Sequence, residues 1–134
     1  MYIERLEHNG RVHTMMTPED LLAAGVPQAA IDQYLAGIRV DAIKAECRRR
    51  IYAHASPEAQ MNVATALGAA SAKTASARSA EETALIAGAQ KGIEWVSAMR
   101  NQIAVLAADQ DADITADAYW PDVPAEAAAL YSQF

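Results

Sequence analysis

The sequence predicts a mainly α protein: a helical bundle or hairpin of long helices with a short N-terminal β-hairpin. In two long segments, 27–54 and 79–107, apolar and small residues recur every three or four positions, which places them on one face of a helix. Hydrophobic residues make up 52% of the 134, yet many are Ala and only one is Phe. Small side chains favour close packing of helices over a sheet. We expect three parts: a hairpin arm at 1–16, a helical bundle at 17–108, and an acidic loop with a short helix packing back at 109–134.

Each long helix has a predicted buried stripe in which the spacing alternates between four and three. In the first helix the stripe is Ile31, Leu35, Ile38, Ala42, Ala45, Arg49 and Tyr52. In the second it is Leu85, Ala89, Gly92, Val96, Met99, Ile103 and Leu106. The same pattern fits a bundle within one chain or a coiled coil between chains. Proline breaks at positions 57 and 121 favour folding back into a bundle.

Residues 2–16 predict the β-hairpin, because Asn9-Gly10 suits a type I′ turn in which both central residues have positive φ. Four residues are expected to make its apolar contacts: Ile3, Leu6, Val12 and Met15. His8 and His13 flank the turn, and we expect them to face each other on a polar face rather than bind a metal. A single hairpin is marginal in water, so it must pack on the helices or on a partner.

Capping residues mark where helices begin and end. Thr17-Pro18 starts a short helix that ends at Gly25. Ser56-Pro57 starts a third, whose stripe becomes steadily more polar: Met61, Ala64, Leu67, Ser71, Thr74 and Arg78. That helix should turn near 73–79, where Ser79 and the acids after it predict a capping box for the second long helix. Pro124 begins the last short helix.

Three features of the first long helix are candidate functional sites: the cysteine, the basic cluster and the histidine. Cys47 is the only cysteine; its arginine neighbours could activate it, but a small core residue is the better interpretation. In the basic cluster, we expect Arg48 and Arg50 to be solvated and the stem of Arg49 to lie along the stripe. His54 should interact with the negative end of its own helix.

The segment 109–122 is acidic. Asp109, Asp111, Asp113 and Asp117 have spacing reminiscent of a calcium loop, but Ile114 and Trp120 occupy the positions that need Gly and Glu. A solvated loop whose Asp side chains hold their own backbone in turns is preferred. The stretch 119–121 should fold back and cover the end of the bundle.

The net charge and the hydropathy of the chain exclude several classes of function. A net charge of −6 argues against nucleic-acid binding. No apolar run approaches the length of a membrane span, and no leader is recognisable, so we expect synthesis in a cytoplasm without membrane attachment. No nucleophile–base pair, phosphate loop or carboxylate pair appears. We therefore expect no enzyme activity, cofactor or metal.

A capped helical hairpin with Trp in its second arm, an Asp-rich loop and a Trp120-Pro121-x-x-Pro124 ending resembles a bacteriophage arrangement. It is similar to the C-terminal part of tail-fibre assembly proteins and to small tail-fibre-region proteins of prophages. The similar stretches are 42–51, 79–100 and 112–124, with Glu81-Glu82, Trp95, Arg100 and Ile114 in the pattern. Such assembly proteins usually carry a β-rich N-terminal region, whereas this chain has only a hairpin.

The resemblance implies a structural component of a tailed phage or phage-like particle, located in the tail or fibre region of the virion and made in the host cytoplasm. It implies other tail or fibre proteins as partners, and we expect a homo-oligomer. The alternative is a tail-fibre chaperone that is absent from the mature particle. The residues predicted to form the interface are Ile3, Leu6, Val12, Trp95, Tyr119, Trp120, Leu130, Tyr131 and Phe134.

Overall fold

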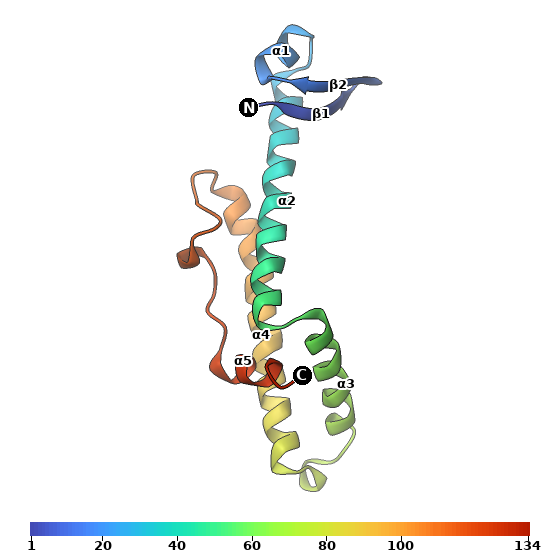
Figure 1. Cartoon of the computed structure of the whole chain (residues 1–134), viewed down its shortest axis with the longest axis vertical. Helices are drawn as coiled ribbons and strands as arrows, with labels where there is room; N and C mark the ends of the chain where they lie inside the picture. Colours follow the sequence, from blue (N-terminus) through green and yellow to red (C-terminus); the bar gives the residue numbers. More distant parts are fainter. The chain divides into compact units, whose positions relative to one another are not determined.

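The computed structural model describes all 134 residues and confirms the predicted fold class (Figure 1). The chain is 67% helical, with five α-helices behind a two-stranded antiparallel hairpin. It divides into two compact units, Met1–Ala42 and Ile43–Phe134. Their boundary falls inside the second helix, so the hairpin shares its unit with α1 and the first half of α2. The predicted division at residues 16 and 108 stays a prediction.

The elements follow one another in this order: β1 Ile3–His8, β2 Arg11–Met16, α1 Pro18–Ala23, α2 Gln28–His54, α3 Pro57–Ser71, α4 Ala80–Ala108 and α5 Ala125–Tyr131. Two single 3₁₀ turns, Ala75–Ala77 and Asp117–Tyr119, lie before α4 and before α5.

The hairpin turn has the predicted geometry, with φ of 50° at Asn9 and 74° at Gly10. This two-residue turn pairs His8 with Arg11 and Leu6 with His13. The expectation that His8 and His13 face each other was therefore wrong, because the register puts each opposite a different residue.

The first unit has its own small core, made by one end of the hairpin, α1 and the start of α2. Its buried members are Ile3, Leu6, Leu21, Val26 and Ile31. Of the four apolar contacts expected in the hairpin, Val12 and Met15 do not form: their exposed fractions are 51% and 63%. Met15 has φ of 52°, which breaks the regular alternation of the strand, and Met16 packs against the core instead.

Helix α1 is closed at both ends. Thr17 and Asp20 form a reciprocal capping box, which confirms Thr17 as the N-cap. At the other end, the N–H of Val26 donates to the carbonyl of Leu21 at 2.9 Å, and that of Gly25 donates to Leu22 at 3.0 Å. These two bonds make a Schellman motif, and Gly25 supplies its left-handed residue with φ of 87°.

The predicted starts of α3 and α4 are also confirmed. The hydroxyl of Ser56 accepts from the N–H of Ala59 at 3.0 Å. Ser79 and Glu82 form the expected capping box, and Lys73 pairs with the Glu82 carboxylate at 2.9 Å. This ion pair links the two sides of the α3–α4 connection.

The predicted stripe is right for α4, where every member is buried or half-buried. In α2 it is right only for Ile31 and Leu35. The other predicted members are all exposed: Ile38, Ala42, Ala45, Arg49 and Tyr52. In the second half of the helix a different face is buried. There the buried face is Ile43, Cys47 and Ile51, and Ala55, just after the helix, continues the constant spacing of four. The two halves of α2 belong to different units, so one stripe could not describe both.

The predicted stripe of α3 is wrong in the same way. Met61 is 68% exposed, and the buried residues are Ala59, Val63 and Ala70, with Leu67 packed against them. Alanine occurs on every face of this helix, so the sequence pattern left the rotation of the helix poorly determined.

Candidate functional site

The structure buries six of the nine residues predicted to form an interface. Ile3 and Leu6 belong to the core of the first unit, and Trp95, Trp120, Leu130 and Tyr131 to the core of the second. Val12, Tyr119 and Phe134 are exposed, at 51%, 38% and 44%. Of the nine, those three are exposed in this conformation, and the other six pack within the chain itself. The predicted interface as such stays a prediction.

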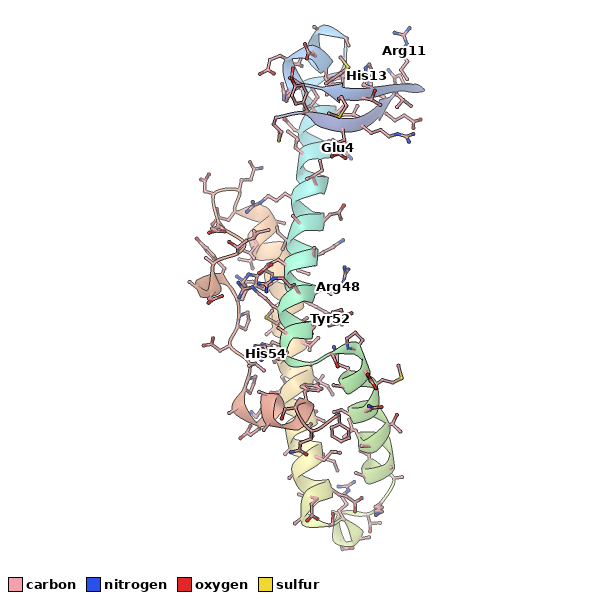
Figure 2. All side chains as sticks on the ribbon, viewed as in Figure 1. Glu4, Arg11, His13, Arg48, Tyr52 and His54 are labelled. Atoms are coloured by element: carbon pink, nitrogen blue, oxygen red, sulfur yellow. The ribbon has the colours of Figure 1, made fainter.

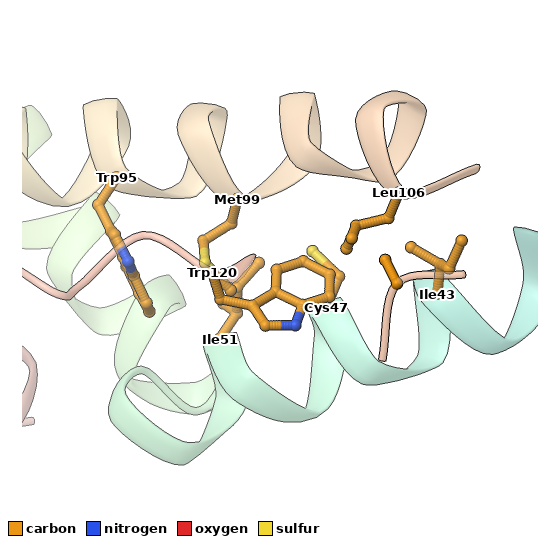
Figure 3. Packing of buried hydrophobic residues seen from close by; sticks show 8 residues of the cluster. Ile43, Cys47, Ile51, Trp95, Met99, Leu106 and Trp120 are labelled. Atoms are coloured by element: carbon orange, nitrogen blue, oxygen red, sulfur yellow. The ribbon is translucent and has the colours of Figure 1, made fainter. Parts of the chain in front are cut away.

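Trp120 packs the segment 109–124 against α2 and α4. It lies among Cys47, Ile51 and Met99 (Figure 3), and its Nε1 donates to the carbonyl of Ile114 at 2.7 Å. Trp95 on α4 donates through its own Nε1 to the carbonyl of Pro121 at 3.2 Å. The segment thus folds back as expected, but it lies along the helices rather than over their end, and Tyr119 stays outside.

The expectation that Arg50 is solvated was wrong: its side chain turns inward and is only 16% exposed. Its guanidinium pairs with Glu46 at 2.7 Å and with Asp117 at 2.9 Å, and it donates to the carbonyl of Thr115 at 2.8 Å. It also stacks over Trp120, 5.6 Å from the ring centroid. The expectation for Arg49 was wrong: its side chain is 64% exposed, because the buried face of α2 is turned away from it.

Glu46 sits between two arginines. Arg49 donates two hydrogen bonds to its carboxylate, at 2.6 and 2.8 Å, and Arg50 donates a third. The bonds from Arg49, with the one from Arg50, lower the pKa of Glu46 from 4.5 to about 2. On this side of the helix pair, every arginine has a carboxylate partner.

Three of the loop's acids, Asp109, Asp113 and Asp117, make hydrogen bonds or an ion pair within the chain, and two of them hold turns as the preferred interpretation predicted. Asp109 accepts from the N–H of Asp111, and Asp113 accepts from both the N–H and the hydroxyl of Thr115. The bonds from Thr115 lower the pKa of Asp113. Asp117 is committed to Arg50. These oxygens hold turns and an ion pair, and no group of three or more acidic, His or Cys side chains is placed to hold a metal ion.

Helix α5 docks on α4 through two glycines. A Cβ at Gly92 would lie 2.5 Å from the hydroxyl oxygen of Tyr131, and one at Gly88 would lie 3.3 Å from a methyl carbon of Leu130. Burial raises the pKa of the Tyr131 hydroxyl. The absence of side chains at these two positions of α4 leaves room for Tyr131 and Leu130, and the predicted burial of Gly92 is confirmed.

A cavity of about 560 Å³ lies where the folded-back segment meets α2 and α4. Its walls include Arg49, Arg50, Trp95, Asp117 and His54. His54 meets the ring of Trp95 edge-on, with centroids 5.8 Å apart. Both arginines here are paired with carboxylates of the chain, Glu46 and Asp117, so neither is a free cation for an anionic ligand.

The helix pair has a second recessed surface, made of two adjoining cavities of about 380 and 290 Å³. Both are lined by Gln60, Val96 and Arg100, so α2, α3 and α4 contribute to one groove. We call this surface the open groove. Figure 2 shows Arg48 and Tyr52 on the side of α2 turned away from the segment 109–124.

The open groove combines an apolar floor with positive charge. Ile51, Val96 and Ile103 line it, and Lys44, Arg48 and Arg100 stand along it. None of its lining residues is acidic, and none of the three cations takes part in an ion pair. Lys44 and Arg48 are four residues apart and so share one face of α2. That spacing was visible in the sequence, but Arg100 comes from a distant segment and only the fold adds it.

Cys47 lies under the open groove and is 3% exposed, which confirms it as a core residue. Burial raises the pKa of its thiol above the ordinary value, although the charges of Arg100 and Arg48 act in the opposite direction. Because the thiol form dominates and the sulfur is covered, Cys47 has no environment for nucleophilic chemistry.

Comparison with known proteins adds no family: no family model matches the chain, and no curated protein matches it. Among the helices of the structure, none combines the length and the hydropathy that a membrane-spanning segment requires.

Proposed function

We propose that this protein is a non-enzymatic structural component of a tailed phage or phage-like particle, in the tail or fibre region, that acts by associating with other subunits. The phage setting rests on the resemblance of its helical hairpin, acidic loop and Trp-Pro ending to tail-fibre-region proteins. The manner of action rests on the surfaces described above, which suit binding to another protein.

The observation that carries the association role is the hairpin. It has only two strands, so each strand has one edge without a neighbouring strand, and such an edge accepts a further strand from another chain. Two apolar side chains, Tyr2 and Val12, stand exposed on it at 64% and 51%. Open edges beside exposed apolar residues are typical of a surface that pairs with another subunit.

The experiment compares purified particles with crude lysate by quantitative mass spectrometry. A structural role predicts a fixed copy number in intact particles, and that number would give the symmetry of the assembly. Presence in the lysate but not in particles would favour the tail-fibre chaperone.

A hairpin variant sharpens this test. Val12→Lys should reduce the copy number in particles several-fold, because it places a charge in the proposed contact. Arg11→Glu, also exposed but on the opposite face of the same strand, is the control and should change incorporation little. Equal incorporation of both variants would remove the hairpin from the interface.

A further inference from the structure

We infer that the open groove binds an acidic amphipathic helix of a partner protein. This inference rests on the proposed association role and names the chemistry of the partner. Three features support it: the shape of the groove, its apolar floor and its unbalanced charge.

The shape suits a helix. The groove is formed by three helices, and its two cavities meet at Gln60, Val96 and Arg100. A groove between helices accepts the apolar stripe of another helix, whose anchor residues recur every three or four positions. Ile93 and Tyr52, which line it and are 52% and 45% exposed, offer the apolar surface for such anchors.

The charge identifies the kind of helix. The chain as a whole carries −6, with 17 acidic and 11 basic residues, yet the lining of this groove has three cations and no acid. The other arginines of α2's second half, Arg49 and Arg50, are both paired with carboxylates of the chain itself. Lys44, Arg48 and Arg100 lack such partners, so carboxylates flanking the apolar stripe of a docked helix would complete their ion pairs.

The apolar floor distinguishes this partner from a polyanion such as a nucleic acid. Binding to phosphates needs positive charge without an apolar surface, and it opposes the acidic balance of the chain. A helix with a stripe of Leu or Ile between two rows of Glu would pack its apolar side chains on the floor of the groove and pair its carboxylates with the three cations.

The probe is a synthetic 18-residue peptide with Leu and Ile on one helical stripe and Glu on both sides, titrated into the full chain by calorimetry. A scrambled peptide of the same composition is the control ligand. We expect the amphipathic peptide to bind at least tenfold more tightly than the scrambled one. Equal affinity for the two, or no binding of either at millimolar concentration, would overturn the inference.

Charge-reversal variants locate the site. Lys44→Glu/Arg48→Glu/Arg100→Glu should weaken binding at least tenfold, whereas Arg5→Glu/Arg11→Glu/Lys91→Glu, with the same change in net charge, should stay within about twofold. The three groove cations are exposed and make no ion pair, so the first variant should fold, which circular dichroism checks. If it does not fold, Tyr52→Glu at an exposed position of the floor replaces it and should weaken binding several-fold.

Three further outcomes separate the alternatives. If charge reversal in the groove dissociates an oligomer of the protein itself, measured by light scattering, the occupant is a second copy and the inference is overturned. If the protein binds the peptide but is absent from particles, the groove assignment is retained and the particle role is overturned. If the protein is present in particles but does not bind the peptide, the particle role is retained and the groove assignment is overturned.

Discussion

The two sides of the α2–α4 pair differ in how their apolar and charged residues are covered. On one side, the chain's own segment 109–124 covers the helices: Trp120 fills the space between them, and Glu46 and Asp117 neutralise Arg50. On the other side lies the open groove, where apolar residues are exposed and three cations take part in no ion pair. The covered side shows what it takes to complete such a surface: a large apolar residue flanked by carboxylates. The open groove lacks both, and we propose that a partner supplies them.

The largest effect should come from removing the residue that closes the covered side. Trp120→Ala should lower the free energy of unfolding by about 3–5 kcal/mol, since it leaves a cavity among buried side chains and breaks the bond to Ile114. Tyr119→Ala, next to it but exposed, should cost less than about 1 kcal/mol. Denaturant unfolding with both variants measures the difference, and similar costs would mean that the segment is not held by Trp120.

Gly92→Ala tests the packing of α5 against α4. The new methyl group would collide with Tyr131, and we expect a loss of about 2 kcal/mol from overpacking. Gly37→Ala is the matched control, because its Cβ would meet open space and should stabilise α2 by up to about 1 kcal/mol. In a Tyr131→Ala background the cost of Gly92→Ala should largely disappear; a cost that persists would place its origin elsewhere than in the α5 contact.

A pair of arginine substitutions compares the two sides directly. Arg50→Gln should cost about 1.5 kcal/mol, because it removes two ion pairs, a hydrogen bond to Thr115 and the stacking on Trp120. Arg48→Gln, two residues away on the open side, should change stability by less than about 0.5 kcal/mol. Thermal or chemical unfolding that ranks the two variants in the opposite order would show that the open side is already completed within the chain.

The smallest predicted effect is a pH dependence from Glu46. Its pKa in the folded chain is about 2, below the ordinary 4.5, so its contribution is present above pH 4.5 and is lost as the pH falls towards 2. Solvent screening at the exposed Arg49 reduces this contribution to about 1 kcal/mol. The difference in unfolding free energy between the wild type and Glu46→Gln should therefore shrink between pH 5 and pH 2. A difference that does not vary with pH would contradict the ion-pair arrangement.

Local signals in the sequence predicted the boundaries of the fold well. Thr17, Ser56 and Ser79 are caps because a side-chain oxygen three residues before a free N–H has the same effect in any context. The turn at Asn9-Gly10 is equally local. The rotation of α2 and α3 could not be predicted, since Ala recurs around both helices and the buried face depends on which distant segment packs there.

The surfaces were predicted less well than the elements. Large apolar residues such as Trp95 and Tyr131 looked like interface anchors, yet the chain uses them internally, because its many alanines leave space that only a few large side chains can fill. The open groove was not predicted, since Arg100 and Arg48 lie 52 positions apart in the sequence (100 minus 48) and meet only through the pairing of α2 with α4.

The central claim, that one side of the helix pair is closed by the chain and the other is closed by a partner, can be tested by hydroxyl-radical footprinting of the free protein and of the protein in purified particles. The account predicts that Tyr52 and Ile93 react in the free protein and become protected in the particle, while Trp95 and Trp120 stay protected in both. Equal reactivity of Tyr52 and Ile93 in the two samples, or strong reaction of Trp120 in the free protein, would contradict it.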